Sequence, residues 1–302
     1  MNLQEEILRL AKQKNATILA HNYQRSEIQD IADHVGDSLD LSQKASDTNA
    51  DIILFCGVKF MAETAKILNP KKKVLVPDVS ALCPLADQLK LDELVKVKRQ
   101  NPGAKTVLYI NTNAWEKVEA DCICTSANAD KIVQAMDSDT VIFGPDQNLA
   151  YYVSKKTDKR LIVAPPTGLC PTHHQMSMDD LLEAKEKHPN AKVVVHPECI
   201  PEVQEAADWV ASTNGILRYC TESKTREFVI GTENGMLHRL QKENPAKLFY
   251  PLSETTICPN MKMNTLDKML SALKNEKPEI IVPEPTLSGS RNAIQRMLDL
   301  SR

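Results

Sequence analysis

Short apolar runs recur along the chain and predict three sets of buried strands. Each set has three members, and the sets follow one another in the same order three times. The sets are residues 17–21, 106–110 and 192–196; residues 51–57, 140–144 and 227–231; and residues 74–77, 161–165 and 248–251. Apolar runs of this kind are typical of strands that are covered on both faces, as in parallel sheets.

Helical patterns lie between these runs. Three segments that follow a predicted strand have helical spacing, namely residues 61–68, 148–153 and 236–240. Strands that alternate with helices indicate parallel sheets with helices on both faces. The pattern therefore predicts an α/β fold.

The same landmarks return after nearly constant intervals. Gly57, Gly144 and Gly231, which end the second set of strands, are spaced by 87 residues each. Three cysteines that each precede a proline are spaced by 87 and 88 residues: Cys83-Pro84, Cys170-Pro171 and Cys258-Pro259. This period is too long for a solenoid repeat, so it indicates one module used three times.

We therefore expect three homologous three-layer α/β/α sandwich domains with parallel sheets, arranged with pseudo-threefold symmetry around a central active site. The predicted domains are residues 1–85, 86–172 and 173–277. The tail, residues 278–302, contains a predicted helix and is expected to pack back on the first domain. In open α/β sheets ligands bind beyond the carboxyl ends of the strands, which here would all face one centre.

Composition excludes several classes of function. The 302 residues are 42% apolar and carry a net charge of −3, with 37 basic and 40 acidic side chains. Neither this charge nor the 4% of aromatic residues is typical of nucleic-acid binding. No apolar run reaches the roughly 20 residues of a membrane span. The acidic, amphipathic N-terminus is not a secretory signal, so we expect a cytoplasmic protein.

The three Cys-Pro pairs are the strongest candidate for a metal centre. Proline stiffens each loop and leaves the cysteine before it in an extended conformation. Thiolates favour zinc or iron–sulfur centres. Structural zinc takes four protein ligands, so three thiolates without an obvious fourth favour a [4Fe–4S] cluster with one open iron. His173 and Cys199 remain alternatives for a fourth ligand, and burial as small apolar side chains is the alternative role for any cysteine.

Polar residues at predicted strand ends are candidates for acid–base chemistry and anion binding. Ser38, Ser126 and Thr213 recur at matching positions before helical segments, where hydroxyls act as N-caps and helix ends attract anions. The leading strands end in His21 and Tyr23, in Tyr109 and Asn111, and in His196 and Glu198. His173 stands three residues after Cys170. Such side chains can donate or accept protons near a metal centre.

Several stretches together resemble one known family, quinolinate synthase of de novo NAD biosynthesis. They are residues 19–24, 36–38, 57–63, 125–128, 141–146, 196–199 and 260–263. The resemblance covers essentially the whole chain. One departure is Leu169, which stands where the family often has histidine, and an extra residue lies near His174.

The resemblance implies a reaction and a set of site residues. Members condense iminoaspartate with dihydroxyacetone phosphate to give quinolinate, phosphate and water, using a [4Fe–4S] cluster whose open iron acts as a Lewis acid. An aspartate-oxidising enzyme would be the transient source of iminoaspartate. The implied cluster ligands are Cys83, Cys170 and Cys258. The implied catalytic residues are Tyr23, Tyr109, His196 and Glu198, and the implied substrate-binding residues are His21, Ser38, Asn111, Ser126, His173, Ser212 and Thr213.

Two alternatives belong to other classes. A non-catalytic iron–sulfur or zinc protein that senses redox state would use the cysteines without substrate turnover. Another cluster-dependent hydro-lyase would use the same scaffold with a different substrate. A sensor has no need of the polar residues at the strand ends, so these residues favour an enzyme.

Overall fold

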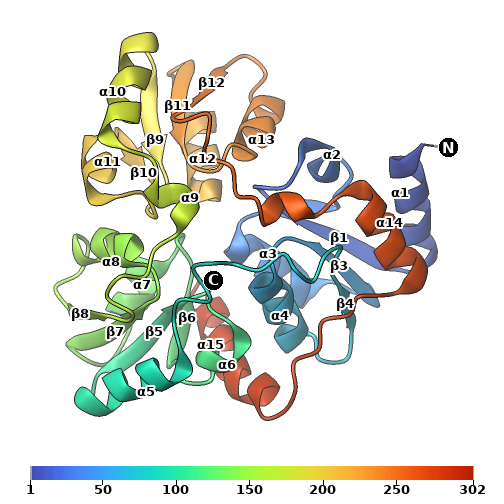
Figure 1. The fold of residues 1–302 in the computed structure, drawn as a ribbon, viewed down its shortest axis with the longest axis horizontal. Helices are drawn as coiled ribbons and strands as arrows, with labels where there is room; N and C mark the ends of the chain where they lie inside the picture. The colour runs from blue at the N-terminus through green and yellow to red at the C-terminus, as the bar shows by residue number, and fades with distance from the viewer. Residues whose placement is uncertain (1, 302) are drawn as a thin grey trace.

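A computed structural model, which describes residues 2–301, contains three sheets of four parallel strands each (Figure 1). The strand order is the same in every sheet, with the second strand of each unit at one edge and the fourth at the other. The sheets are β2 (His34–Gly36)–β1 (Ala16–His21)–β3 (Ile52–Cys56)–β4 (Lys73–Leu75); β6 (Cys122–Cys124)–β5 (Lys105–Tyr109)–β7 (Thr140–Gly144)–β8 (Arg160–Val163); and β10 (Trp209–Val210)–β9 (Lys192–Val195)–β11 (Glu227–Gly231)–β12 (Leu248–Pro251). The three predicted strand sets are confirmed.

Helices cover both faces of each sheet, which confirms the predicted three-layer α/β/α arrangement (Figure 1). The helices of the first unit are α1 (Leu3–Gln13), α2 (Ser26–Gln29), α3 (Ser38–Asp47) and α4 (Lys59–Leu68). Those of the second are α5 (Leu91–Gln100), α6 (Ala114–Lys117), α7 (Ala129–Gln134) and α8 (Gln147–Ser154). The short helix α9 (Pro171–His174) leads to α10 (Met178–Lys187), α11 (Pro201–Ala206), α12 (Thr213–Glu222) and α13 (Met236–Glu243) of the third.

A repeated aspartate fixes the start of each sheet. The carboxylates of Asp33, Asp121 and Asp208 accept backbone N–H groups of the leading strands, at Ile18, Thr106 and Val193, over 2.7, 2.8 and 2.8 Å respectively. The strands themselves are almost fully buried, so these backbone donors would otherwise lose their hydrogen bonds to water. The same hydrogen bond from a strand N–H to an aspartate side chain is therefore present in all three units.

The end of the chain packs against the first two units. After the short 3-10 helix η1 (Met261–Met263), α14 (Leu266–Asn275) lies on α1. Ile280 then donates its N–H to Val74 and extends the edge of β4. Helix α15 (Thr286–Leu300) contacts β6, α6 and α4. The domain boundaries near residues 85, 172 and 277 stay predictions.

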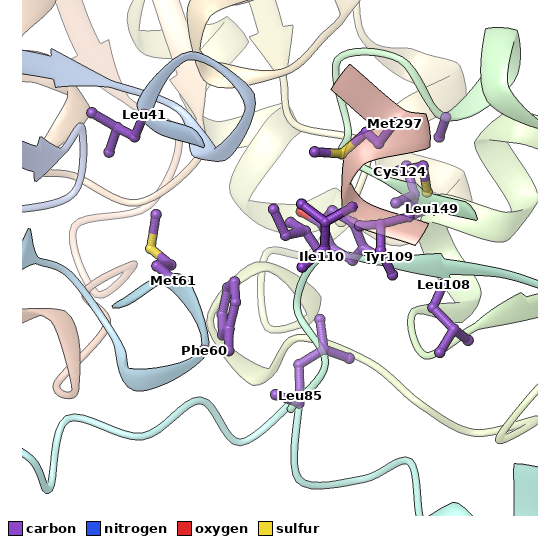
Figure 2. Close-up of a cluster of buried hydrophobic side chains, with 14 of the residues drawn as sticks. Leu41, Phe60, Met61, Leu85, Leu108, Tyr109, Ile110, Cys124, Leu149 and Met297 are labelled. Carbon is purple, nitrogen blue, oxygen red and sulfur yellow. The ribbon is translucent and has the colours of Figure 1, made fainter. Parts of the chain in front are cut away.

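Helix α15 packs against the second sheet. Met297 of this helix is fully buried and lies near Cys124 of β6 (Figure 2), in agreement with the packing of α15 on this strand. Cys124 is fully buried and packs as a small apolar residue. Within residues 2–301, no helix combines the length and the apolar character that crossing a bilayer requires.

Candidate active site

Loops that follow strands of all three sheets line one cavity of about 160 Å³. Because parallel strands end at the same edge of a sheet, three units around a centre bring the strand ends of all three sheets together. Every predicted site residue except Ser212 lines this cavity: His21, Tyr23, Ser38, Cys83, Tyr109, Asn111, Ser126, Cys170, His173, His196, Glu198, Thr213 and Cys258. Ser212 lies alongside and donates to Asp37, a cavity residue, over 3.3 Å.

The three cysteines of the Cys-Pro pairs meet at this cavity. Cys83, Cys170 and Cys258 follow β4, β8 and β12, and each is half-buried. Burial raises the pKa of the Cys83 thiol to about 12. It also raises the pKa of Cys170 and Cys258, so these thiols are neutral when no metal is bound. A cation at the centre would reverse this, because metal binding releases thiol protons.

The spacing of the three thiols bears on the kind of metal centre. A single zinc ion holds its sulfurs at about 2.3 Å, so they come within about 4 Å of one another. Among residues 2–301, the Sγ atoms of these three cysteines do not all lie within 4.8 Å of one another. The donor set therefore fits a centre with several metal atoms better than a single ion.

A second group, Cys170, His173 and Glu198, does meet that distance. Its shortest separation joins His173 Nδ1 to Glu198 Oε2 over 2.8 Å. This distance is that of a charge-assisted hydrogen bond, and it leaves no room for an ion between the two atoms. We therefore interpret the pair as an acid–base contact.

Glu198 is the centre of a buried hydrogen-bond network. Its Oε1 accepts from the Tyr109 hydroxyl over 2.7 Å and from Asn111 over 3.4 Å. Burial alone would raise the pKa of Glu198, but the neighbouring His173, with smaller contributions from His196 and the hydrogen bond of Tyr109, holds that pKa below its ordinary value. Glu198 is therefore an ionised carboxylate although its side chain is buried.

A chain of contacts leads from Tyr23 to the same carboxylate. The Tyr23 hydroxyl lies 2.6 Å from Thr232 Oγ1, which lies 2.9 Å from His173 Nε2. Since His173 Nδ1–H donates to Glu198, Nε2 is the acceptor for the Thr232 hydroxyl, which in turn accepts from Tyr23. Burial and then the charge of Glu198 raise the pKa of Tyr23, so it holds its proton.

Two histidines are fixed as neutral donors by the same local device. His21 Nδ1 accepts the backbone N–H of Tyr23 over 3.2 Å, and His196 Nδ1 accepts that of Glu198 over 3.3 Å. The proton of each neutral ring is therefore on Nε2. His196 Nε2 lies 3.1 Å from Ser126. Burial lowers the pKa of both imidazoles to about 3, so both are uncharged at neutral pH.

The prediction that Ser38, Ser126 and Thr213 cap their helices is wrong. Asp37 caps α3, and Ser212 caps α12 through its hydroxyl. The third helix of the set, α7, begins after Asn128 and has no side-chain cap. A carboxylate or hydroxyl one residue earlier satisfies the helix N–H groups, which leaves the hydroxyls of Ser38 and Thr213 on the cavity wall.

Four further residues at the site escaped the sequence reasoning: Asp37, Asp146, Thr232 and Glu233. Asp37, Asp146 and Glu233 are buried carboxyls that accept backbone N–H groups, and Thr232 links Tyr23 to His173. The sequence contains a signal for two of them, because Asp146 and Glu233 each stand two residues after a repeated glycine.

A cavity of buried acids, bases and thiols at the junction of three α/β units defines an enzyme active site. The chain belongs to the quinolinate synthetase A family, since the family described as Quinolinate synthetase A protein matches residues 5–299. This agrees with the resemblance seen in the sequence. The family membership and the site together identify an enzyme.

Similar curated proteins come from bacteria and archaea. The chain is 53% identical over 296 residues to the quinolinate synthase of Thermodesulfovibrio yellowstonii, covering 98% of this chain and 97% of that protein. It is 51% identical to the quinolinate synthase of Pyrococcus horikoshii, with both chains covered completely. It is also 51% identical to the quinolinate synthase of Methanocaldococcus jannaschii, with 99% of each chain covered.

Proposed function

We propose that this chain condenses iminoaspartate with dihydroxyacetone phosphate to give quinolinate, phosphate and water. The observation that carries the proposal is that three thiols and the Glu198 network line one cavity. The names of the relatives support the same activity. A redox sensor would need the thiols but not the buried acid–base groups, so the cavity favours catalysis.

Cys83, Cys170 and Cys258 would hold a [4Fe–4S] cluster. The three Sγ atoms do not all lie within 4.8 Å of one another, which supports this choice over a single zinc ion. When bound, the cluster supplies Lewis-acid chemistry at an iron atom that no protein group occupies.

The substrates would be held without positively charged side chains. Among the described residues, none that lines the cavity is a lysine or an arginine. The donors available for phosphate and carboxylate groups are the Nε2–H groups of His21 and His196 and the hydroxyls of Ser38, Ser126 and Thr213. The N-termini of the ten-residue helices α3 and α12 add their partial positive charge.

Proton transfer would be assigned to Tyr23 and the groups behind it. A tyrosine that holds its proton can give it to a leaving hydroxyl, and Tyr23 would regain a proton when the substrate loses one in another step. Glu198 accepts the Nδ1–H of His173 and so keeps Nε2 as the acceptor for the Thr232 hydroxyl, which lies against Tyr23. Tyr109 donates to Glu198 and keeps the carboxylate oriented.

Anaerobic reconstitution followed by a turnover assay tests the proposal. We expect the loaded protein to contain iron and sulfide in equal amounts and to form quinolinate from the two substrates. Cys83→Ser should lose both the cluster and the activity. A loaded wild-type protein that forms no quinolinate would contradict the proposed reaction, and a protein that takes up zinc but no sulfide would contradict the proposed cluster.

The variant Glu198→Gln separates catalysis from cluster binding. Amide replacement removes the charge that supports His173 and leaves the three cysteines unchanged. We expect turnover to fall by about 100-fold or more, with iron and sulfide content equal to that of the wild type. Glu205→Gln, an exposed carboxylate remote from the cavity, is the control and should keep full turnover. Unchanged turnover in Glu198→Gln would remove this carboxylate from the mechanism.

A further inference from the structure

In each unit, the loop that carries the cysteine is tied to the loop after the third strand. A backbone N–H beyond that strand donates to the carbonyl two residues before the cysteine. The three bonds are Lys59 N to Ala81 O over 2.8 Å, Gln147 N to Gly168 O over 2.7 Å, and Asn234 N to Thr256 O over 2.9 Å. This tie belongs to the repeated module.

The second and third units add a buried carboxylate to this tie. Asp146 Oδ2 accepts the backbone N–H of Cys170 over 3.0 Å, and Glu233 Oε1 accepts that of Cys258 over 3.1 Å. Both side chains are 0% exposed. The other oxygen of each carboxylate is also occupied, by Leu149 N over 2.7 Å in one case and by Gly235 N over 2.8 Å in the other. Each carboxylate therefore fixes two loops in one orientation.

The first unit lacks this carboxylate. Two residues separate Gly144 from Gln147 and Gly231 from Asn234, but only Val58 separates Gly57 from Lys59. The position that is missing is the one that Asp146 and Glu233 occupy in the other units.

The loop of Cys83 is instead held by the neighbouring units. Gln88 donates to the carbonyl of Leu169 over 2.9 Å and accepts its N–H over 3.0 Å. Asn260 donates to the carbonyl of Leu82 over 2.6 Å. These contacts join residues that are 81 and 178 positions apart. They therefore depend on the assembly of all three units around the cavity.

We propose that Asp146 and Glu233 are positioning residues that fix Cys170 and Cys258 for the metal centre, and that Cys83, whose loop has no such carboxylate, depends on contacts from the neighbouring units to complete its positioning. The inference rests on the proposed cluster but concerns loop order that exists without it. A carboxylate with both oxygens bonded to backbone N–H groups holds a buried loop strongly, because charge-assisted bonds are about twice as strong as neutral ones. Two ligands would thus be ordered in advance, and the third would complete the site.

Substitution by the matching amide tests each tie separately. Asp146→Asn and Glu233→Gln keep the shape but turn one acceptor oxygen into an N–H donor that faces another donor. In the protein without metal, mass spectrometry after pulsed alkylation gives a rate for each thiol. We expect Asp146→Asn to raise the rate of Cys170 by roughly tenfold and to leave Cys258 unchanged, with the reverse for Glu233→Gln. Asn260→Ala, at a partly exposed position, should raise the rate of Cys83 alone.

The controls are Asp121→Asn and Asp208→Asn, in the same two units. Each of these carboxylates accepts a backbone N–H of a leading strand, away from the cysteine loops. They should leave all three alkylation rates unchanged. Equal rates in wild type, Asp146→Asn and Glu233→Gln would overturn the inference, as would equal increases in the controls.

A second readout is the rate at which a chelator strips the reconstituted cluster. We expect it to rise by roughly tenfold in Asp146→Asn and Glu233→Gln relative to the wild type and the controls. A wild-type protein that binds no iron and sulfide would contradict the proposed cluster, while the alkylation rates would still decide the positioning role.

Discussion

Glu198 shows how much one residue depends on its neighbours. Its carboxylate is 3% exposed, yet hydrogen bonds from Tyr109 and His173 keep it ionised. Its place at the end of a leading strand made it predictable, because strand ends meet at the cavity in a parallel sheet. Thr232 was not predictable, since its contact with Tyr23 joins residues 209 positions apart and depends on how two units pack.

The pH dependence of turnover tests the state of the two neutral histidines. The lowered pKa of His21 and His196, about 3 in each case, means that they gain a proton only far below neutral pH. We therefore expect neither to produce an acid limb near pH 6.5, the ordinary histidine value. Profiles of kcat/KM for the wild type, His21→Gln and His196→Gln provide the measurement. A limb near pH 6.5 that vanishes in either variant would show that the imidazole is charged in the working range.

At the scale of single elements, strands were predicted better than helix starts. The leading strand at 17–21 corresponds to β1, because an uninterrupted apolar run has few alternatives in a buried sheet. The cap of α3 was assigned to Ser38 but belongs to Asp37. Both residue types are good caps, so sequence alone does not decide between neighbours one position apart.

Helix α15 offers a test of how the tail supports the second sheet. Met297 is fully buried against β6, whereas Asn292 on the same helix is exposed. Met297→Ala should lower the free energy of unfolding by about 2–5 kcal/mol, because it leaves a cavity in a packed core. Asn292→Ala should change it by less than about 0.5 kcal/mol. Denaturant unfolding of both variants gives the comparison, and equal effects would mean that α15 does not contribute to this core.

At the scale of the whole molecule, the threefold spacing of Gly57, Gly144 and Gly231 was enough to predict three similar sheets. Each unit is built from the same order of strands and helices, so its landmark residues recur at a fixed period in the sequence. The cavity between the units could be predicted only as a meeting point of strand ends. Which side chains bond across it, such as Asn22 to Thr213 over 2.7 Å, depends on the relative orientation of the units.

Exposure to air tests how the metal centre relates to the fold. Leu82 and Ile257, which precede two of the cysteines, are 40% and 48% exposed, so oxygen can reach the proposed cluster. The buried apolar core extends through all three units, so we expect the chain to fold without the metal. Aerobic purification should therefore give protein without turnover but with an unchanged far-ultraviolet circular dichroism spectrum. Full activity after aerobic purification, without reconstitution, would contradict an open iron atom.

The lack of lysine and arginine among the described residues of the cavity wall bears on how a product leaves. A carboxylate 4 Å from a fixed cation is held by about 4 kcal/mol at an effective dielectric constant of 20. Each such pair would slow escape by about a thousandfold. Donors without net charge can orient a multiply charged anion and still release it quickly. The wall is thus suited to rapid exit of an anion rather than to its retention.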